Sequence, residues 1–475
     1  MHPASRLREN LNQMLRIIRG NRHDLFELAT ALLEPEIQAA TPGHRPIHVV
    51  VKPNWVQHRA ESSDSWDALI TSPDLVEQVV RAVAALTNGR AVVSVCDAPH
   101  TVADFEAILD RGGLRQRLAR AGTEWPTLDL EILDLRRERW IQEDSVIVGR
   151  EVNTEDPRGY TAVDLGLRSC LYRHPGEGRF YGADYDRDGV NRHHRGVRHE
   201  YLLAGTPLDA DLFINLPKLK THRKTGITAA LKNLVGINGD KNWLPHHTDG
   251  CPANGGDERP SIGWMDWVET RLKPLVQATT LKAPALGAPL YRLARRGGAT
   301  MFDHQRPTIR NGNWQGNDTC WRMALDLNRA LLFANRDGSL RTGAQPKRYF
   351  CIVDGIVGGE GNGPIDPEPV FSNVLIAGNN PAEVDAAAAR VMGFDIEQLP
   401  IVRRAFDDHV LPIGRTPLHL LTCHDERVGA DIPVNEVQPA VRGGFRPHSG
   451  WPDLPAFRAG AQRAVAGTTG ERVTS

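Results

Sequence analysis

Three consecutive segments decide the fold: HVVVKPNW at 48–55, SPDLVEQVVRAVAALT at 72–87 and RAVVSVCDAPH at 90–100. The first and third are short runs rich in β-branched residues, which is typical of strands, and the second has apolar residues at helical spacing. Ser72 as N-cap, Pro73 at the first helical position and Gly89 beyond the end mark the limits of the helix. A strand, a helix and a strand in this order form a βαβ unit, so the sequence predicts parallel strands joined by a right-handed crossover.

Strand and helix signals alternate along the rest of the chain. Further strands are predicted in LDLEILDL (128–135), DADLFINLPKLKTH (209–222, running into a polar loop), KRYFCIVDG (347–355) and NVLIAG (373–378). Helices are predicted over 224–236 and after Asn380, where Pro381 and Glu383 complete an approximate capping box. The fold class is therefore α/β: a mostly parallel sheet flanked by helices, with long insertions over the carboxyl ends of the strands.

The 475 residues divide into three predicted parts. Residues 1–45 have apolar residues at helical spacing and are expected to form an N-terminal helical segment. Residues 46–425 make an α/β core domain, with irregular insertions at about 136–208 and 244–345. From 426 to 475 the composition turns to Gly, Pro, Ala and Arg without clear periodicity, so a peripheral or disordered tail is expected.

Composition excludes several classes of partner. Lys plus Arg is 57 against 58 for Asp plus Glu, and this balance gives no bulk attraction to nucleic acid or to an anionic membrane. The six Cys are scattered without a CxxC pair, so no iron–sulfur cluster is encoded and isolated thiols fit a reducing compartment. The first residues lack the apolar core of a signal peptide, and no long apolar run occurs. We expect a cytoplasmic protein, and the sequence leaves its oligomeric state open.

The predicted strands deliver polar residues at their carboxyl ends. Lys52 and Asn54 follow the first strand, Asp97 ends the second, and Lys218 and Asp354 follow two later strands. In open α/β sheets ligands bind at this edge, near a topological switch point. Turns also favour Asp and Asn, which would explain Asp354 but explains the lysines poorly. We take Lys52, Asp97, Lys218 and Asp354 as candidate catalytic residues, with Lys52 as a general acid or base if desolvation lowers its pKa.

Lysine is concentrated in one part of the chain. Nine of the 57 basic residues are Lys, and five of these lie between positions 218 and 241. In the predicted helix 224–236, Lys224, Thr228 and Lys232 are four residues apart and share a face. Together with the helix N-terminus this face would make a cradle for phosphate or carboxylate, and the alternative is an exposed helix with solvated lysines. The candidate substrate-binding residues are Asn54, Lys220, His222, Lys224, Thr228, Lys232, Asn233 and Lys241.

A divalent metal site is the second prediction for this region. GINGDKNWLPHHTDG (236–250) and GGDER (255–259) mix histidine and carboxylate ligands on one long loop. VDGIVGGEGNGP (353–364) adds a glutamate on a Gly-rich turn, which lacks the GK[ST] of a Walker loop. A loop held by polar hydrogen bonds is the alternative to a metal. The candidate ligands are His246, His247, Asp257, Glu360 and Asp385.

These motifs together resemble a known family. KPNW, SPDLV, CDAP, the long block from PKLKTH to PHHTDG, VDGI with GEGNGP, and AGNNPAEVD look like the domain of unknown function 362 family. The resemblance covers about positions 48–400 in the expected order. Some members of that family carry a ferredoxin iron–sulfur segment, and this chain departs from them because it has no cysteine cluster. The resemblance implies no particular reaction.

We expect an enzyme that acts on a small anionic metabolite, phosphorylated or carboxylated, with assistance from a divalent metal ion. The lysines would bind or neutralise the anion, and the carboxylates and histidines would ligate metal or transfer protons. Two other hypotheses stay open at this point. One is a redox protein that uses an external iron–sulfur partner or a bound cofactor, and the other is a non-catalytic anion-binding module.

Overall fold

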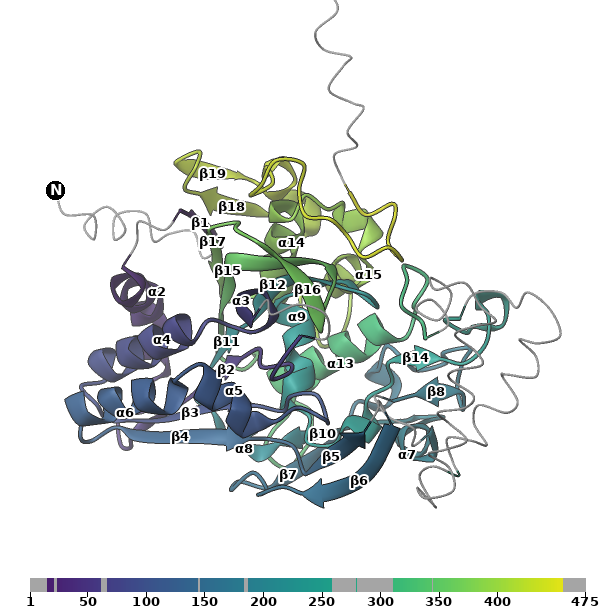
Figure 1. Ribbon diagram of the computed structural model, residues 1–475, viewed down its shortest axis with the longest axis horizontal. Coiled ribbons are helices and arrows are strands. Elements are labelled where there is room, and N and C mark those ends of the chain that lie inside the picture. The colour runs from purple at the N-terminus through teal and green to yellow at the C-terminus, as the bar shows by residue number, and fades with distance from the viewer. Residues whose placement is uncertain are drawn as a thin grey trace, which may run out of the picture.

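The computed structural model describes residues 15–20, 24–60, 66–143, 146–182, 187–258, 279, 311–343 and 345–455. Its main element is a mixed sheet in the order β19-β18-β1-β17-β15-β11-β2-β3-β4 (Figure 1). The strands are β1 (Arg16–Arg19), β2 (Ile47–Pro53), β3 (Ala91–Asp97), β4 (Asp129–Asp134), β11 (Leu212–Leu216), β15 (Tyr349–Asn362), β17 (Val374–Gly378), β18 (Thr422–Asp425) and β19 (Ala430–Pro433). The five consecutive strands β15, β11, β2, β3 and β4 are parallel, which confirms the predicted α/β class.

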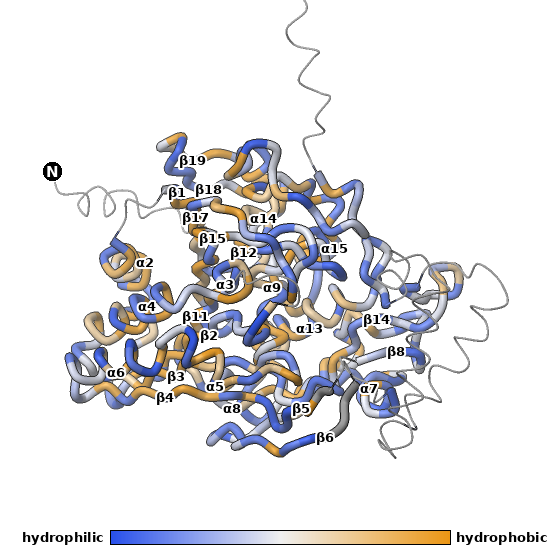
Figure 2. Tube along the Cα trace, viewed as in Figure 1, coloured by the Kyte–Doolittle hydropathy of each residue, from blue (hydrophilic) through white to orange (hydrophobic). Residues whose placement is uncertain are grey.

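Helices cover both faces of the sheet because the strand residues alternate between two apolar cores. Val49 and Val51 pack with α2 (Leu25–Ala40), α4 (Pro73–Leu86), α5 (Phe105–Arg111) and α6 (Leu114–Glu124) on one face. Val50, between them, packs on the other face with α9 (Ala230–Asn233), α13 (Cys320–Phe333), α14 (Pro381–Val391) and α15 (Pro400–Arg403). Figure 1 shows these two helix layers, and Figure 2 shows that strands such as β3 and β17 are mainly hydrophobic. No helix of the described chain is long and apolar enough to cross a membrane.

The first predicted insertion contains ordered secondary structure. Two strands, β5 (Glu138–Glu143) and β6 (Val146–Val152), form a hairpin. A small sheet joins β7 (Tyr160–Asp164), β10 (Arg198–Ala204) and β9 (His194–Arg195), and β8 (Phe180–Tyr181) pairs with β14 (His247–Thr248). Two short helices, α7 (Arg187–His193) and α8 (Gly205–Asp209), lie in the same region. Most of the second predicted insertion lies outside the described residues.

The predicted helix over 224–236 is wrong in its first half. Gly226 has a φ of +80°, and residues Gly226–Thr228 form strand β13, which pairs with β12 (Lys218–His222) as a hairpin. Regular helix is limited to α9 and a 3-10 turn over Leu234–Ile237. Ile227 and Thr228 are β-branched, so the pairing with β12 overrides the helical spacing. The polar loop predicted at Lys218 and Lys220 is likewise a strand, which also pairs with β15 and so extends the sheet.

The two ends of the chain also differ from expectation. Residues Arg16–Arg19 form a strand between β17 and β18 where a helix was predicted, whereas α2 lies within the second predicted helical stretch. Residues 426–455 of the predicted tail pack on the domain, and Trp451 and Leu454 are buried in the core. Apolar side chains in a Gly-rich and Pro-rich stretch therefore fix it to the domain without regular periodicity.

Helix starts agree better with prediction. The Asn380 side chain accepts hydrogen bonds from the backbone N–H groups of Ala382 and Glu383, as an N-cap does. The Glu383 carboxylate accepts from the backbone of Thr416, so the box is not reciprocal. Ser72 precedes α4, but its side chain makes no capping bond. Its backbone N–H instead donates to Asp354 at 2.7 Å, which ties the start of α4 to β15.

Candidate functional site

The order of the parallel strands creates a switch point between β2 and β11. From β2 the chain adds β3 and β4 on one side, and it later adds β11 and β15 on the other side. Lys52 near the end of β2 is the register partner of Asn215 in β11. Helices leaving the two strands diverge to opposite faces at such a point and leave a crevice at the carboxyl ends. The fold therefore favours a ligand site beside Lys52 and Asn215.

A cavity of about 390 Å³ lies at this edge. Its volume suits a small molecule. Ten of the predicted site residues line it: Asn54, Asp97, His222, Lys224, Thr228, Lys232, Asn233, Lys241, His246 and His247. They come from the ends of β2 and β3, from β12 and β13, from α9, and from the loop that follows α9. The structure thus brings residues almost 200 positions apart in the sequence to one cavity.

An ion pair between Lys52 and Asp97 lies at the cavity floor. The Lys52 Nζ atom donates to Asp97 at 2.8 Å, to the Pro53 carbonyl at 2.9 Å and to Asn233 at 3.2 Å. The other Asp97 oxygen accepts from the Trp55 backbone N–H at 2.7 Å. Three acceptors satisfy the three donors of an ammonium group, so Lys52 has no lone pair to offer as a base. Lys52 holds Asp97 in place and does not itself line the cavity.

Gly236 allows this pair to approach the backbone of the 3-10 turn. A Cβ atom at this position would lie 1.9 Å from Asp97 Oδ1 and 2.5 Å from Lys52 Nζ. The carbonyl of Gly236 also accepts a hydrogen bond from the Ala98 backbone at 2.7 Å. Close packing of backbone against an ion pair requires a residue without a side chain. Gly226, in contrast, is required by its positive φ and by Leu399, whose side chain would be 2.3 Å from a Cβ atom.

Amide side chains connect the two strands of the switch point. Asn233 donates to the Asn215 side chain at 2.7 Å and accepts from Asn54 at 3.0 Å. The Asn54 Oδ1 atom is buried at the cavity and has no hydrogen-bond partner among the described residues. An acceptor in this condition is costly unless a ligand supplies a donor. Asn54 is therefore placed to accept a hydrogen bond from bound substrate.

The cavity wall is strongly cationic. Four cationic side chains line it, from Arg223, Lys224, Lys232 and Lys241, whereas Asp97 is the single carboxylate among its described lining residues and is already paired. Burial lowers the pKa of Lys232, and burial lowers the pKa of Lys241 to about 7. A buried cation loses its hydration, so an anion that enters the cavity regains much of that free energy.

Three histidines line the same space in neutral form: His222, which is buried, and His100 and His246, which are half-buried. Burial, followed by the charge of Lys232, holds the pKa of both His222 and His246 well below the usual value, and burial lowers the pKa of His100 to about 4. His222 Nδ1 accepts from the backbone N–H groups of Lys224 and Thr225, so its proton is on Nε2. His246 Nδ1 lies 2.8 Å from the Leu244 carbonyl and donates to it, so its Nε2 carries a lone pair. The cavity therefore holds one imidazole donor and one imidazole acceptor.

Lys218, Lys220 and Asp354, which were predicted as catalytic or substrate-binding residues, also lie outside the cavity. Lys218 and Asp354 form a buried ion pair of 2.8 Å between β12 and β15, and neither lines the cavity. Lys220 points to the Leu69 carbonyl at 2.5 Å, and burial holds its pKa well below the usual value. Because these partners are internal, the catalytic role predicted for Lys218 and Asp354 and the substrate contact predicted for Lys220 do not fit the geometry.

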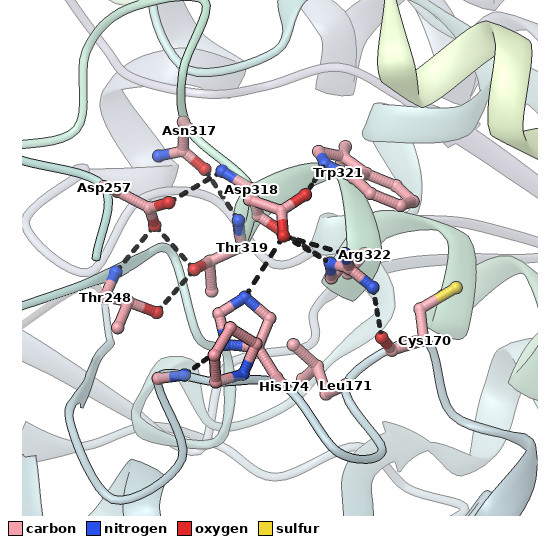
Figure 3. A network of polar contacts seen from close by, with 12 residues as sticks. Cys170, Leu171, His174, Thr248, Asp257, Asn317, Asp318, Thr319, Trp321 and Arg322 are labelled. Carbon is pink, nitrogen blue, oxygen red and sulfur yellow. Dashed lines mark hydrogen bonds and ion pairs between the residues drawn. The ribbon is translucent and has the colours of Figure 1, made fainter. Parts of the chain in front are cut away.

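The predicted metal ligands do not meet. Asp257 accepts from the Thr319 hydroxyl and from the backbone of Thr248 and Asp318, which fixes its loop to the start of α13 (Figure 3). Glu360 accepts a hydrogen bond from the Arg446 backbone at 2.8 Å. Asp385 accepts from the backbone N–H groups at the start of α9, and burial raises its pKa to about 7. His246 and His247 line the cavity, but within the described ranges no group of three His, Cys, Asp or Glu side chains could hold a metal ion.

Several lining residues were not among the predicted site residues. His100 ends the predicted strand segment CDAPH, and Arg223 lies inside the lysine block, so both carried a local signal. Tyr181, Asn311 and Asn313 add further polar side chains to the lining. Tyr181 stacks on His247 with ring centroids 4.7 Å apart, from a strand of only two residues. Nothing in the periodicity of that segment indicates a site residue.

Fold and cavity together define an α/β protein with a cationic ligand site at a topological switch point. The model of the family described as domain of unknown function (DUF362) matches residues 130–390. The match covers more than half of the chain, which belongs to this family. The family name carries no activity. No curated protein matches the chain.

Proposed function

We propose that this protein is an enzyme that binds a small phosphorylated or carboxylated metabolite in the cavity at the switch point. The observation that carries the proposal is the charge of the cavity wall. Four cations face a space whose one carboxylate, among the described lining residues, is already paired with Lys52. Each hydrogen bond from such a cation to an anion contributes about 1.5–3 kcal/mol, so two or three suffice for specific binding.

The arrangement of neutral groups supports a chemical role beyond binding. His246 Nε2 can accept a proton, and His222 Nε2–H can donate a hydrogen bond to an oxygen that gains negative charge. Both rings are held by backbone atoms, which fixes their tautomers before a ligand arrives. A site built only to retain an anion would need the cations without these two oriented imidazoles.

Binding is tested first, because it does not require the reaction to be known. Oxalate and inorganic phosphate are expected to raise the melting temperature of the whole chain in a concentration-dependent manner. Lys232→Met is expected to weaken this effect, because one of the four cations that line the cavity is lost. Arg120→Met is the matched control, because Arg120 is an exposed cation on α6 and does not line the cavity. Equal stabilisation of the wild type and Lys232→Met would contradict the assignment of the site.

Catalysis is tested by turnover of phosphorylated and carboxylated metabolites, followed by mass spectrometry. His246→Gln is expected to abolish product formation while the stabilisation by oxalate persists, because the glutamine lacks the imidazole base but the cations remain. Binding of a metabolite by the wild type without any turnover across the panel would instead support a non-catalytic anion-binding module.

A further inference from the structure

Lys232 differs from the other buried lysines of this region because it has no hydrogen-bond or ion-pair partner among the described residues. Its side chain projects from α9 to the cavity, only 7% of the residue is exposed, and no hydrogen bond or ion pair joins it to any described residue. Lys52 and Lys218 each pair with a carboxylate at 2.8 Å. Lys241 donates to the Val235 carbonyl at 2.8 Å. Lys232 is thus the one lysine of this set whose nitrogen is left to a ligand.

The surroundings of Lys232 make its ammonium proton easier to remove. Its α9 neighbours Ala230 and Leu231 are buried, whereas Cys320 at the start of α13 acts in the opposite direction and raises the pKa of Lys232 by a smaller amount than burial lowers it. Burial lowers the pKa of Lys232, so the amine loses its proton more easily than a solvated lysine does. A neutral amine has the lone pair that nucleophilic attack on a carbonyl group requires.

We propose that Lys232 forms a Schiff base with an anionic carbonyl compound, such as a 2-oxo acid or a phosphorylated aldehyde. This inference rests on the proposed function, because the same cavity would hold the anionic group. Lys224, Lys241 and Arg223 line the wall and would hold the carboxylate or phosphate. The carbonyl carbon would then lie next to the Lys232 nitrogen. The substrate class is thereby narrowed from small anions to anions that carry an aldehyde or ketone.

The neighbouring histidines supply the proton transfers. The Lys232 nitrogen attacks the carbonyl carbon, a C–N bond forms, and the C=O π electrons move to oxygen, where His222 Nε2–H stabilises the charge. His246 Nε2 accepts a proton from nitrogen and passes it to oxygen, which gives the neutral carbinolamine. His246 Nε2 then takes up one proton from solvent water. The nitrogen lone pair expels the hydroxyl, which receives this proton from His246 and leaves as water. The product is an iminium ion, and no oxidant or reductant is consumed.

Borohydride trapping tests this step on the whole wild-type chain without knowledge of the natural reaction. The probe is glyoxylate, and hydride converts the iminium ion into a stable secondary amine. We expect a carboxymethyl group on the peptide that contains Lys232, at a level at least tenfold above that given by propanal, an uncharged aldehyde of similar size. Excess oxalate should suppress the label by occupying the cationic wall.

Two variants make the result specific. Lys232→Arg keeps a cation but cannot form an imine, so the label should disappear while oxalate still raises the melting temperature. Lys241→Arg should retain the label on Lys232. Labelling of Lys241 in place of Lys232, or no label on Lys232 in a protein that oxalate stabilises, would overturn the Schiff-base inference and leave the anion site standing. No label together with no stabilisation by oxalate or phosphate would refute the inference and the proposed function together.

Discussion

Replacing Lys232 by methionine should stabilise the protein although it removes a group from the site. Methionine has a similar unbranched shape and fills the same apolar surroundings without a charge. A buried polar group without a partner costs about 1–3 kcal/mol, and Lys232 is 7% exposed with no partner among the described residues. We therefore expect the free energy of unfolding of Lys232→Met to exceed that of the wild type by about 1–3 kcal/mol at pH 7.

Lys52→Met provides the matched comparison, since Lys52 is also a buried lysine of the same region. Its removal leaves the Asp97 carboxylate buried without its ion-pair partner, which costs about 3–5 kcal/mol. The two lysine-to-methionine changes should therefore have opposite signs. Equilibrium unfolding in urea, in the absence of oxalate, measures the free energy of unfolding of both variants.

The gain in stability from Lys232→Met should depend on pH, because it comes from the removal of a buried charge. Because the folded-state pKa of Lys232 lies below the ordinary lysine value of 10.5, the unfolded chain binds more protons between the two values. In the wild type, the free-energy cost of burying the Lys232 charge is present in full below the folded-state pKa and disappears as the pH rises towards 10.5. The advantage of Lys232→Met should thus shrink between pH 7 and pH 10. A variant that is destabilised at pH 7 as strongly as Lys52→Met would refute the view that Lys232 is unpartnered.

Three further predictions concern Gly236 beside the cavity, the buried Asp385 on α14, and the effect of metal ions on anion binding. Gly236→Ala should lower the free energy of unfolding by at least about 2 kcal/mol and abolish stabilisation by oxalate, because its Cβ would meet Asp97 at 1.9 Å; an alanine variant with wild-type urea unfolding and oxalate response would disprove the close packing. Burial raises the pKa of Asp385 to about 7, so its contribution to stability falls as the pH rises from about 4 to 7. Asp385→Asn should remove this part of the pH dependence. If urea titrations from pH 4 to 8 gave the variant the same pH profile as the wild type, the raised pKa of Asp385 would be refuted. Dialysis against a chelator should leave the oxalate-induced rise in melting temperature intact, because the described cations suffice for binding, and loss of the effect with recovery on adding Mg²⁺ or Mn²⁺ would show that the anion is held through a metal.

The parallel core of the sheet could be predicted because its information is local. Val49, Val50 and Val51 form a continuous apolar run, which is what a strand buried on both faces requires. Pro73 and Asn380 mark helix starts through their own backbone chemistry, which needs no tertiary contact. The helix prediction failed at residues 226–228 for the opposite reason, since their pairing with β12 is a tertiary contact that overrides helical spacing.

The candidate site was predicted where lysines cluster, but the sequence could not separate paired from unpaired lysines. Lys218 and Lys232 cannot be told apart in the sequence. In the structure Lys218 pairs with Asp354, 136 positions away, and Lys232 forms no hydrogen bond or ion pair with any described residue. Asp257 and Asp385 belong to a residue type that often ligates metal ions, but in the structure both accept hydrogen bonds from the backbone. Tyr181 reaches the cavity from an insertion whose short strand has no periodic signal.

Proton uptake on anion binding tests the central claim, a buried cationic site for anions, most directly. Titration calorimetry with oxalate at pH 8, in buffers of different ionisation enthalpy, measures the protons that bind with the ligand, and oxalate itself has none to exchange at this pH. Burial lowers the pKa of Lys241 to about 7 and lowers that of Lys232, so an anion that raises both values should draw protons from the buffer. We predict binding with net proton uptake in the wild type and a smaller uptake in Lys232→Met. Absence of binding, or binding without proton uptake, would contradict the account.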